Sequence, residues 1–184
     1  MIMKKFVLFL GFLGVFTSIF SQKYLTKTGH INFFSSTPVE DINADNYKVS
    51  SVLDASTGNL VFKLSVESFE FKKKLMQEHF NENYMESDTY PNSTFKGKIT
   101  NMGEVDLDTP GEYDVNVVGK LTIHGVTKEI STTGQLHVAD ESLSAKSEFT
   151  VSPSDYEIVI PKLVRGKIGK ELLIKVELEY EKMK

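Results

Sequence analysis

The strongest constraint on the fold is the strict alternation of residue types near the C-terminus. From Leu172 to Tyr180 every second residue is apolar, and the residues that alternate with them from Lys175 to Glu179 are charged. Only an extended backbone, with its period of 2, puts these two sets on opposite faces, and a helix would scatter both around its axis. The pattern recurs at 58–67 and at 112–123, where Gly119 interrupts the apolar face. The sequence therefore predicts strands with one apolar and one solvated face.

Eight strands are predicted in an all-β domain. They are expected at residues 29–35, 47–53, 60–66, 95–100, 112–124, 129–138, 143–151 and 171–180, with 155–160 as a short ninth. Turn-forming residues at 56–59, 109–111 and 124–125 separate apolar-patterned runs. Short connections between strands of this spacing favour an antiparallel meander, either a sandwich or a barrel.

One segment breaks the strand pattern. Between residues 71 and 85 the apolar residues, among them Leu75, Met76 and Phe80, follow helical spacing. Pro91 stops any continuation and favours an extended conformation at Tyr90. A single helix in an otherwise all-β domain is predicted to act as a lid or plug.

Residues 1–21 have the features of a secretory signal peptide. Lys4 and Lys5 precede an apolar run over 6–16, and small residues then lead to a predicted cleavage site after Ser21. The apolar stretch over 6–20 is shorter than the roughly 20 residues that a spanning helix needs. We therefore expect a single domain over 22–184, exported to the periplasm or secreted, with no stable membrane insertion.

The amino-acid composition excludes several classes of chemistry and binding partner. The chain has no cysteine, which excludes disulfides and thiolate chemistry. Removal of Lys4 and Lys5 with the leader shifts the formal net charge from −4 to −6. A mildly acidic protein is a poor candidate for binding nucleic acid or the surface of an anionic membrane. A homodimer is left open.

The sequence carries no recognisable catalytic motif. It has neither a G-x-S-x-G elbow nor a P-loop, because residues 166–170 lack the spacing and the Ser/Thr of that motif. The four histidines, His30, His79, His124 and His137, form no H-x-H, H-x-x-x-H or H-E-x-x-H pair. We expect neither catalysis, nor a cofactor, nor a metal site.

A cationic cluster lies at residues 162–170, where Lys162, Arg165, Lys167 and Lys170 occur within nine residues. One interpretation is a solvated hairpin. The other is a rim that meets an anionic head group, because Arg and Lys form charge-assisted contacts with phosphate. Arg165 and Lys167 are the head-group candidates.

Aromatic side chains point to one shared apolar interior. The strand patterns leave open whether that interior is a packed core or holds a ligand. The aromatic candidates are Phe33, Phe62, Phe69, Phe80, Tyr84, Phe95, Tyr113 and Phe149.

Several segments together resemble the YceI-like family of exported bacterial proteins, often described as polyisoprenoid-binding. They are the opening strand at 29–35 (GHINFFS), the helix and following Y-P-x-x-T-F motif at 76–97, and the hairpin at 119–128 (GKLTIHGVTK). The resemblance continues through Phe149 and 155–158 to the C-terminal strand. The opening strand departs from the family's F-x-V-x-H pattern, because Phe33-Phe34-Ser35-Ser36 lacks the histidine.

The resemblance implies an extended eight-stranded antiparallel barrel, similar to a lipocalin, with a helix near its mouth. The long chain of an amphiphile such as an isoprenoid, quinone or fatty-acid derivative would lie inside, held for carriage or sequestration. The alternative is a structural or stress-protective barrel with a packed interior. The residues expected to line the ligand site are Phe33, Leu60, Phe62, Leu64, Phe69, Leu75, Met76, Phe80, Tyr84, Phe95, Tyr113, Val117, Phe149, Ile174 and Val176.

Overall fold

The computed structural model describes residues 22–140 and 142–183. The predicted signal peptide lies outside the described residues. The strands are β1 (Lys23–Ser36), β2 (Asp41–Asp54), β3 (Asn59–Ser65), β4 (Glu70–Phe71), β5 (Asn92–Ile99), β6 (Gly111–Ile123), β7 (Val126–Val138), β8 (Leu143–Val151) and β9 (Leu172–Lys182). Among the described residues, no helix is long and apolar enough to span a bilayer.

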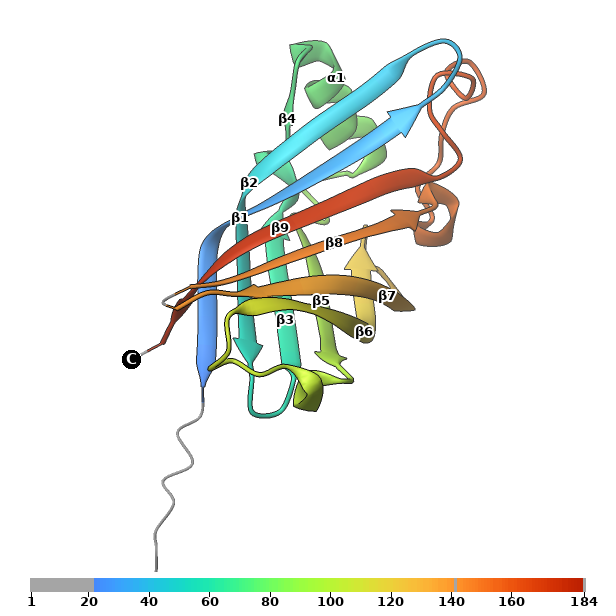
Figure 1. Ribbon diagram of the computed structural model, residues 1–184. Coiled ribbons are helices and arrows are strands. Elements are labelled where there is room, and N and C mark those ends of the chain that lie inside the picture. The colour runs from blue at the N-terminus through green and yellow to red at the C-terminus, as the bar shows by residue number, and fades with distance from the viewer. Residues whose placement is uncertain (1–21, 141, 184) are drawn as a thin grey trace, which may run out of the picture.

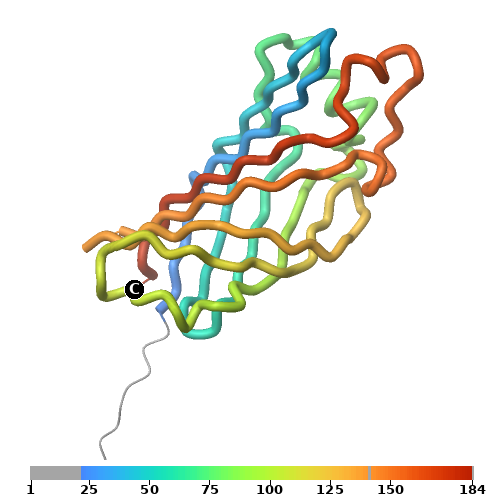
Figure 2. Tube along the Cα trace, turned by 45° about the vertical axis from the view of Figure 1, so that its right-hand side comes forward, coloured from blue at the N-terminus to red at the C-terminus, as the bar shows by residue number. Residues whose placement is uncertain are grey.

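Eight of these strands close into an antiparallel barrel (Figures 1 and 2). The sheet runs β1-β9-β8-β7-β6-β5-β3-β2, and β1 pairs with β2 to complete the ring. The two-residue β4 extends β2 outside this ring. Of the two architectures that the strand patterns left open, the barrel is the one that forms.

The predicted helix is confirmed, although it is shorter than expected. Helix α1 (Lys74–His79) continues as a π-helical segment, η2 (Phe80–Tyr84). Three short 3₁₀ segments occupy other connections: η1 (Val66–Ser68), η3 (Met102–Glu104) and η4 (Pro153–Tyr156). The short ninth strand predicted at 155–160 is wrong. Pro153 opens the 3₁₀ segment η4 there, and Glu157 ends it in the left-handed conformation with φ of 58°.

Two strands are longer than the alternation predicts. β1 begins at Lys23 and β2 at Asp41, about six residues before the expected starts. A bulge around Gly29 shifts the pairing of β1 with β2 and breaks the period of 2. Three buried positions in these strands, Thr26, Ser35 and Asn46, carry polar side chains. The inward face therefore does not show as an apolar pattern in the sequence.

The alternating segments otherwise place their apolar residues inwards as predicted. In β9, Val176, Leu178 and Tyr180 are buried, and the charged residues between them are exposed. Gly119 interrupts the face of β6 because the ring of Phe95 lies across it. A Cβ on Gly119 would lie 2.6 Å from Phe95 Cζ and 2.5 Å from the Cα of Gly97.

The two ends of the barrel differ. At one end lie both described termini, where the Met183 amide donates to the Lys23 carbonyl over 2.7 Å. At the other end, which we call the mouth, lie the β1–β2 turn (37–40), the helical connection from β4 to β5, the β6–β7 turn and the long β8–β9 loop (152–171) (Figure 1). The β6–β7 turn is a two-residue loop with φ of 50° at His124 and 75° at Gly125, as in a type I′ turn.

Candidate functional site

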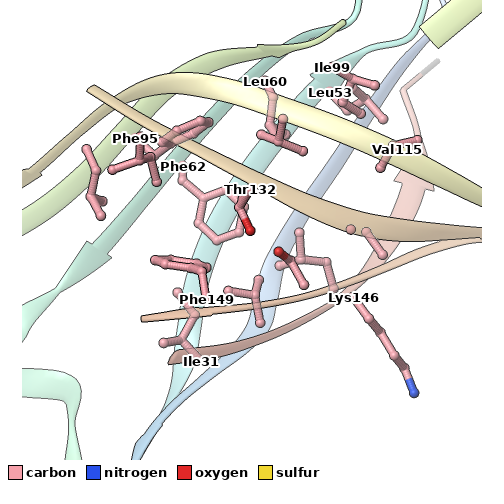
Figure 3. A pocket seen from close by; sticks show the side chains of 18 of the residues that line it. Ile31, Leu53, Leu60, Phe62, Phe95, Ile99, Val115, Thr132, Lys146 and Phe149 are labelled. Atoms are coloured by element: carbon pink, nitrogen blue, oxygen red, sulfur yellow. The ribbon is translucent and has the colours of Figure 1, made fainter. Parts of the chain in front are cut away.

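The barrel interior contains an apolar cavity of ≈ 120 Å³, which we call the lumen cavity. Figure 3 shows the rings of Phe62, Phe95 and Phe149 around it, whereas Lys146 extends away from it. Its apolar lining is Ile31, Leu53, Leu60, Phe62, Leu64, Phe95, Ile99, Val115, Val117, Leu121, Ile130, Leu136, Ala145, Phe149, Val176, Leu178 and Tyr180. Among these aliphatic and aromatic side chains, a hydrocarbon would find contacts along its whole length.

A buried hydroxyl pair lies on the barrel wall beside the lumen cavity. The hydroxyls of Tyr180, which lines the cavity, and Ser51 lie 2.7 Å apart, and both residues are buried. Burial raises the pKa of the Tyr180 phenol, so that this group stays neutral. The pair satisfies two polar groups without adding charge to the lumen.

A second cavity of ≈ 410 Å³ lies at the mouth, and we call it the upper chamber. The helix contributes Leu75, Met76, His79, Phe80 and Tyr84 to its lining, and the β8–β9 loop contributes Ile158, Ile160, Val164, Lys167 and Ile168. Phe33, Ser35, Glu40, Ile42, Phe71, Lys73, Met85, Pro153 and Leu172 complete it. Its volume falls within the ≈ 300–1,000 Å³ that is usual for small-molecule sites.

The lumen cavity and the upper chamber follow one another along the strands. On β1, Ile31 lines the lumen cavity and Phe33 lines the upper chamber, and on β9 the corresponding residues are Val176 and Leu172. Ile174 lies between these last two in sequence and lines neither cavity. The two cavities therefore succeed one another along the barrel wall, with a short apolar segment between them.

A cluster of aromatic side chains borders the upper chamber where β1 passes from one cavity to the other. The ring of Phe33 stacks on Phe80 at 5.5 Å and lies 5.5 Å from Phe69, and Phe69 meets Phe80 edge-on at 5.5 Å. Phe71 joins this cluster, 5.1 Å from Phe80 and 5.7 Å from Phe33. We call these four residues the phenylalanine divide. Two of its members, Phe80 in η2 and Phe71 in β4, come from the helical connection and the strand before it.

Charged groups of the upper chamber lie on one side of it. Lys73 Nζ lies 2.7 Å from Glu40 Oε1. The hydrogen bond from Lys73, together with the charges of Lys73 and Lys167, lowers the pKa of the Glu40 carboxyl. Glu40 is therefore ionised at neutral pH, and the two lysines leave one positive charge in excess beside the apolar lining.

Hydrogen bonds connect the mouth segments to one another. His124 Nε2 lies 2.8 Å from Glu86 Oε2, and His124 Nδ1 lies 3.3 Å from the Tyr156 carbonyl. The ring of Tyr90 packs edge-on against His124 at 4.5 Å. On the opposite side, the Gly169 amide donates to Ser35 Oγ over 2.8 Å. The helical connection and the β8–β9 loop are thus each connected to the barrel at defined points.

The predicted site residues fall into three groups. Leu60, Phe62, Leu64, Phe95, Val117, Phe149 and Val176 line the lumen cavity, and Phe33, Leu75, Met76, Phe80 and Tyr84 line the upper chamber. The third group lines neither cavity: Phe69 belongs to the buried core, and Ile174 packs against it. Tyr113 lines neither cavity, and its hydroxyl donates to the Thr109 carbonyl over 2.9 Å.

The two head-group candidates separate. Lys167 lines the upper chamber, whereas Arg165 lines a neighbouring groove and donates to the Ile160 carbonyl over 3.3 Å. Sequence reasoning missed Lys73 and Glu40, which lie 33 residues apart and meet only in the fold. It also missed Ile158, Ile160 and Ile168, whose loop has no periodic pattern. Val115, Leu178 and Tyr180 share the alternation that found their neighbours.

The histidines do not converge. His30 lies 2.8 Å from Asp45 on the barrel wall, His124 pairs with Glu86 at the mouth, and His79 lines the upper chamber. Over residues 22–140 and 142–183, no three His, Asp or Glu side chains come close enough to hold a metal ion.

The sequence profile of the YceI-like domain family matches residues 17–180. The chain belongs to the YceI-like family. No curated protein matches it in sequence. A polyisoprenoid binding domain from Saccharophagus degradans, implicated in plant cell wall breakdown, superposes with a TM-score of 0.77 at 17% identity, over 89% of this chain and 99% of that one.

Two further solved structures share the fold of this YceI-like chain. BcnA of Burkholderia cenocepacia has a TM-score of 0.69 at 18% identity and covers 82% of this chain and 95% of its own. The YceI protein of Campylobacter jejuni has a TM-score of 0.58 at 17% identity, over 99% of both chains. At these identities the likeness establishes the fold alone, and it agrees with the YceI-like barrel described above.

Proposed function

We propose that this YceI-like protein binds the long chain of an amphiphile, such as an isoprenoid, quinone or fatty-acid derivative, inside the barrel. The proposal rests on one observation: an apolar cavity in the barrel follows directly on a larger chamber at the mouth. The Saccharophagus degradans domain of the same fold, described as polyisoprenoid-binding, supports this ligand class. The role is carriage or sequestration outside the cytoplasm, without catalysis.

The cavity volumes determine how such a ligand would lie. An apolar cavity of about 150 Å³ holds one benzene molecule, so the lumen cavity of ≈ 120 Å³ does not hold a long chain alone. The upper chamber of ≈ 410 Å³ would take the head group and the first part of the chain. The distal part would pass the phenylalanine divide into the lumen, which requires Phe33 or Phe80 to change rotamer.

Affinity should therefore rise with chain length. Each buried CH₂ contributes about 0.8 kcal/mol, or roughly a fourfold change in Kd. Isothermal titration of prenyl alcohols of increasing length should show this rise, followed by a plateau once both cavities are filled. A barrel with a purely structural role would show no dependence on length. Native mass spectrometry of protein from its own host, followed by denaturing extraction, would identify the bound compound.

The head-group site can be tested with two neighbouring cations. Lys167→Gln should weaken binding of a prenyl phosphate while sparing the prenyl alcohol of equal length, because Lys167 lines the chamber. Arg165→Gln is the matched control, since Arg165 lines the neighbouring groove. The Lys167 effect should shrink as salt rises, because charges are screened over about 8–10 Å near physiological ionic strength. Equal losses for both ligands, or for both variants, would argue against a head-group role for Lys167.

A further inference from the structure

The most exposed apolar side chains of the described residues gather at the mouth. The four largest exposed fractions belong to Leu163 (93%), Val159 (77%), Val39 (66%) and Leu75 (61%). Val159 and Leu163 lie in the β8–β9 loop, Val39 in the β1–β2 turn and Leu75 at the start of α1. We call the three segments 37–40, 72–75 and 157–171 the mouth rim.

All three segments of the rim contribute to the upper chamber. Leu75, Glu40 and Lys167, one from each segment, all line the upper chamber. Figures 1 and 2 show the tip of the β1–β2 hairpin beside the loop before β9, with α1 at the same end of the barrel. The four most exposed aliphatic residues therefore lie in the segments around the chamber, whereas the exposed valines of the wall, such as Val61 and Val118, are less exposed.

The rim is also cationic, unlike the chain as a whole. Its segments carry seven basic residues (three consecutive lysines at 72–74 and four cations at 162–170) against Glu40, Glu157 and Glu171. Of these acids, Glu40 is paired with Lys73. The net charge of −6 that remains without Lys4 and Lys5 averages over all faces, so the acidic composition does not describe the surface that a partner at the mouth would meet.

We propose that the mouth rim docks on an anionic phospholipid bilayer. Exposed aliphatic residues flanked by lysines are the combination that binds an interface: the apolar tips enter the region between head groups and acyl chains, and the cations meet anionic head groups. The docked barrel presents its upper chamber to the lipid surface. The proposal adds a membrane-loading surface to the proposed function, whose amphiphilic ligand would enter from that bilayer.

The test measures vesicle binding of the chain from Gln22 onward, which contains every strand of the barrel. Co-sedimentation with vesicles of phosphatidylethanolamine and phosphatidylglycerol is compared with phosphatidylcholine vesicles. The variant Val159→Ser with Leu163→Ser should bind the anionic vesicles at least tenfold more weakly, because two exposed aliphatic anchors are removed. Lys72→Gln with Lys162→Gln should lose roughly fivefold per lysine, and only on anionic vesicles.

Matched controls are available on the barrel wall. Val61→Ser with Val118→Ser alters exposed valines away from the mouth (44% and 39% exposed), and Lys96→Gln with Lys120→Gln alters wall lysines. Both controls should bind vesicles as the unaltered chain does. No vesicle binding by the unaltered chain, or equal losses in control and rim variants, would overturn the proposal. So would a dimer in ultracentrifugation that Val159→Ser with Leu163→Ser converts to monomer without any vesicle binding, since the rim would then be a subunit interface.

The docking proposal and the proposed ligand binding can each be contradicted without the other. Val159, Leu163, Lys72 and Lys162 do not line the upper chamber or the lumen cavity, so their variants should bind a prenyl alcohol in vesicle-free solution with unchanged affinity. Ligand binding without vesicle binding would remove the docking surface alone. Vesicle binding without affinity for any long-chain amphiphile would remove the proposed function and leave the docking surface in place.

Discussion

Replacing Val117 with phenylalanine should remove most of the affinity for a long-chain amphiphile while the barrel still folds. Val117 lies on β6, is 9% exposed, and lines the lumen cavity. The added ring would occupy the space into which the distal part of the chain extends. Exclusion of about four methylene groups costs about 3 kcal/mol, or roughly 100-fold in Kd. A short ligand that stays in the upper chamber should bind as before.

The neighbouring residue supplies the control. Val118 points outwards and is 39% exposed, so Val118→Phe makes the same chemical change on the other face of the same strand. It should leave the affinity unchanged for both short and long ligands. Thermal unfolding of both variants shows that the barrel is intact, since overpacking costs about 1–3 kcal/mol. If Val117→Phe binds the long ligand as tightly as the unaltered chain does, the chain does not reach the lumen cavity.

The contrast between Val117 and Val118 shows what the sequence predicts well. A period of 2 assigns each residue of a regular strand to one face, so Leu60, Val117 and Val176 were correctly placed inside. The alternation no longer assigns residues to the correct face where a bulge shifts it or a buried residue is polar. The bulge at Gly29 and the buried Asn46 conceal the first parts of β1 and β2.

Contacts between segments distant in sequence were beyond prediction. The alternation says that Phe33 faces inwards, but not that it meets Phe69 and Phe80 from another part of the chain. It therefore predicts one apolar interior where the structure has two cavities and a divide. Whether an apolar interior is a packed core or a ligand site depends on the positions of a few side chains. Those positions are set by tertiary packing and not by the local sequence pattern.

The sequence also does not show which basic residues line the chamber. Arg165 and Lys167 are two residues apart and look equivalent in sequence, but only Lys167 lines the upper chamber. Lys73 belongs to a run of three lysines that reads as an exposed helix start, but its ammonium group lies 2.7 Å from Glu40 beside that chamber. The sequence identifies the cationic cluster at 162–170, whereas the fold decides which cations line the chamber.

Truncating Phe33 to alanine should both destabilise the empty barrel and open the path between its cavities. Phe33 is 8% exposed and contacts the rings of Phe69, Phe71 and Phe80. Loss of a buried phenylalanine costs about 3–5 kcal/mol, which denaturant unfolding of the ligand-free protein would measure. The void joins the upper chamber to the lumen cavity, so stopped-flow uptake of a long-chain ligand should become at least tenfold faster.

Phe34→Ala is the matched control, because Phe34 follows Phe33 on β1 but points to the other face and is only partly buried. Its truncation should cost less stability and leave the uptake rate unchanged. A large stability loss for Phe33→Ala with unchanged uptake would mean that the four rings are ordinary core packing and that the chain enters by another route. Faster uptake in both variants would assign the effect to general loosening of β1. Only faster uptake confined to Phe33→Ala identifies the phenylalanine divide as the barrier that a ligand must pass.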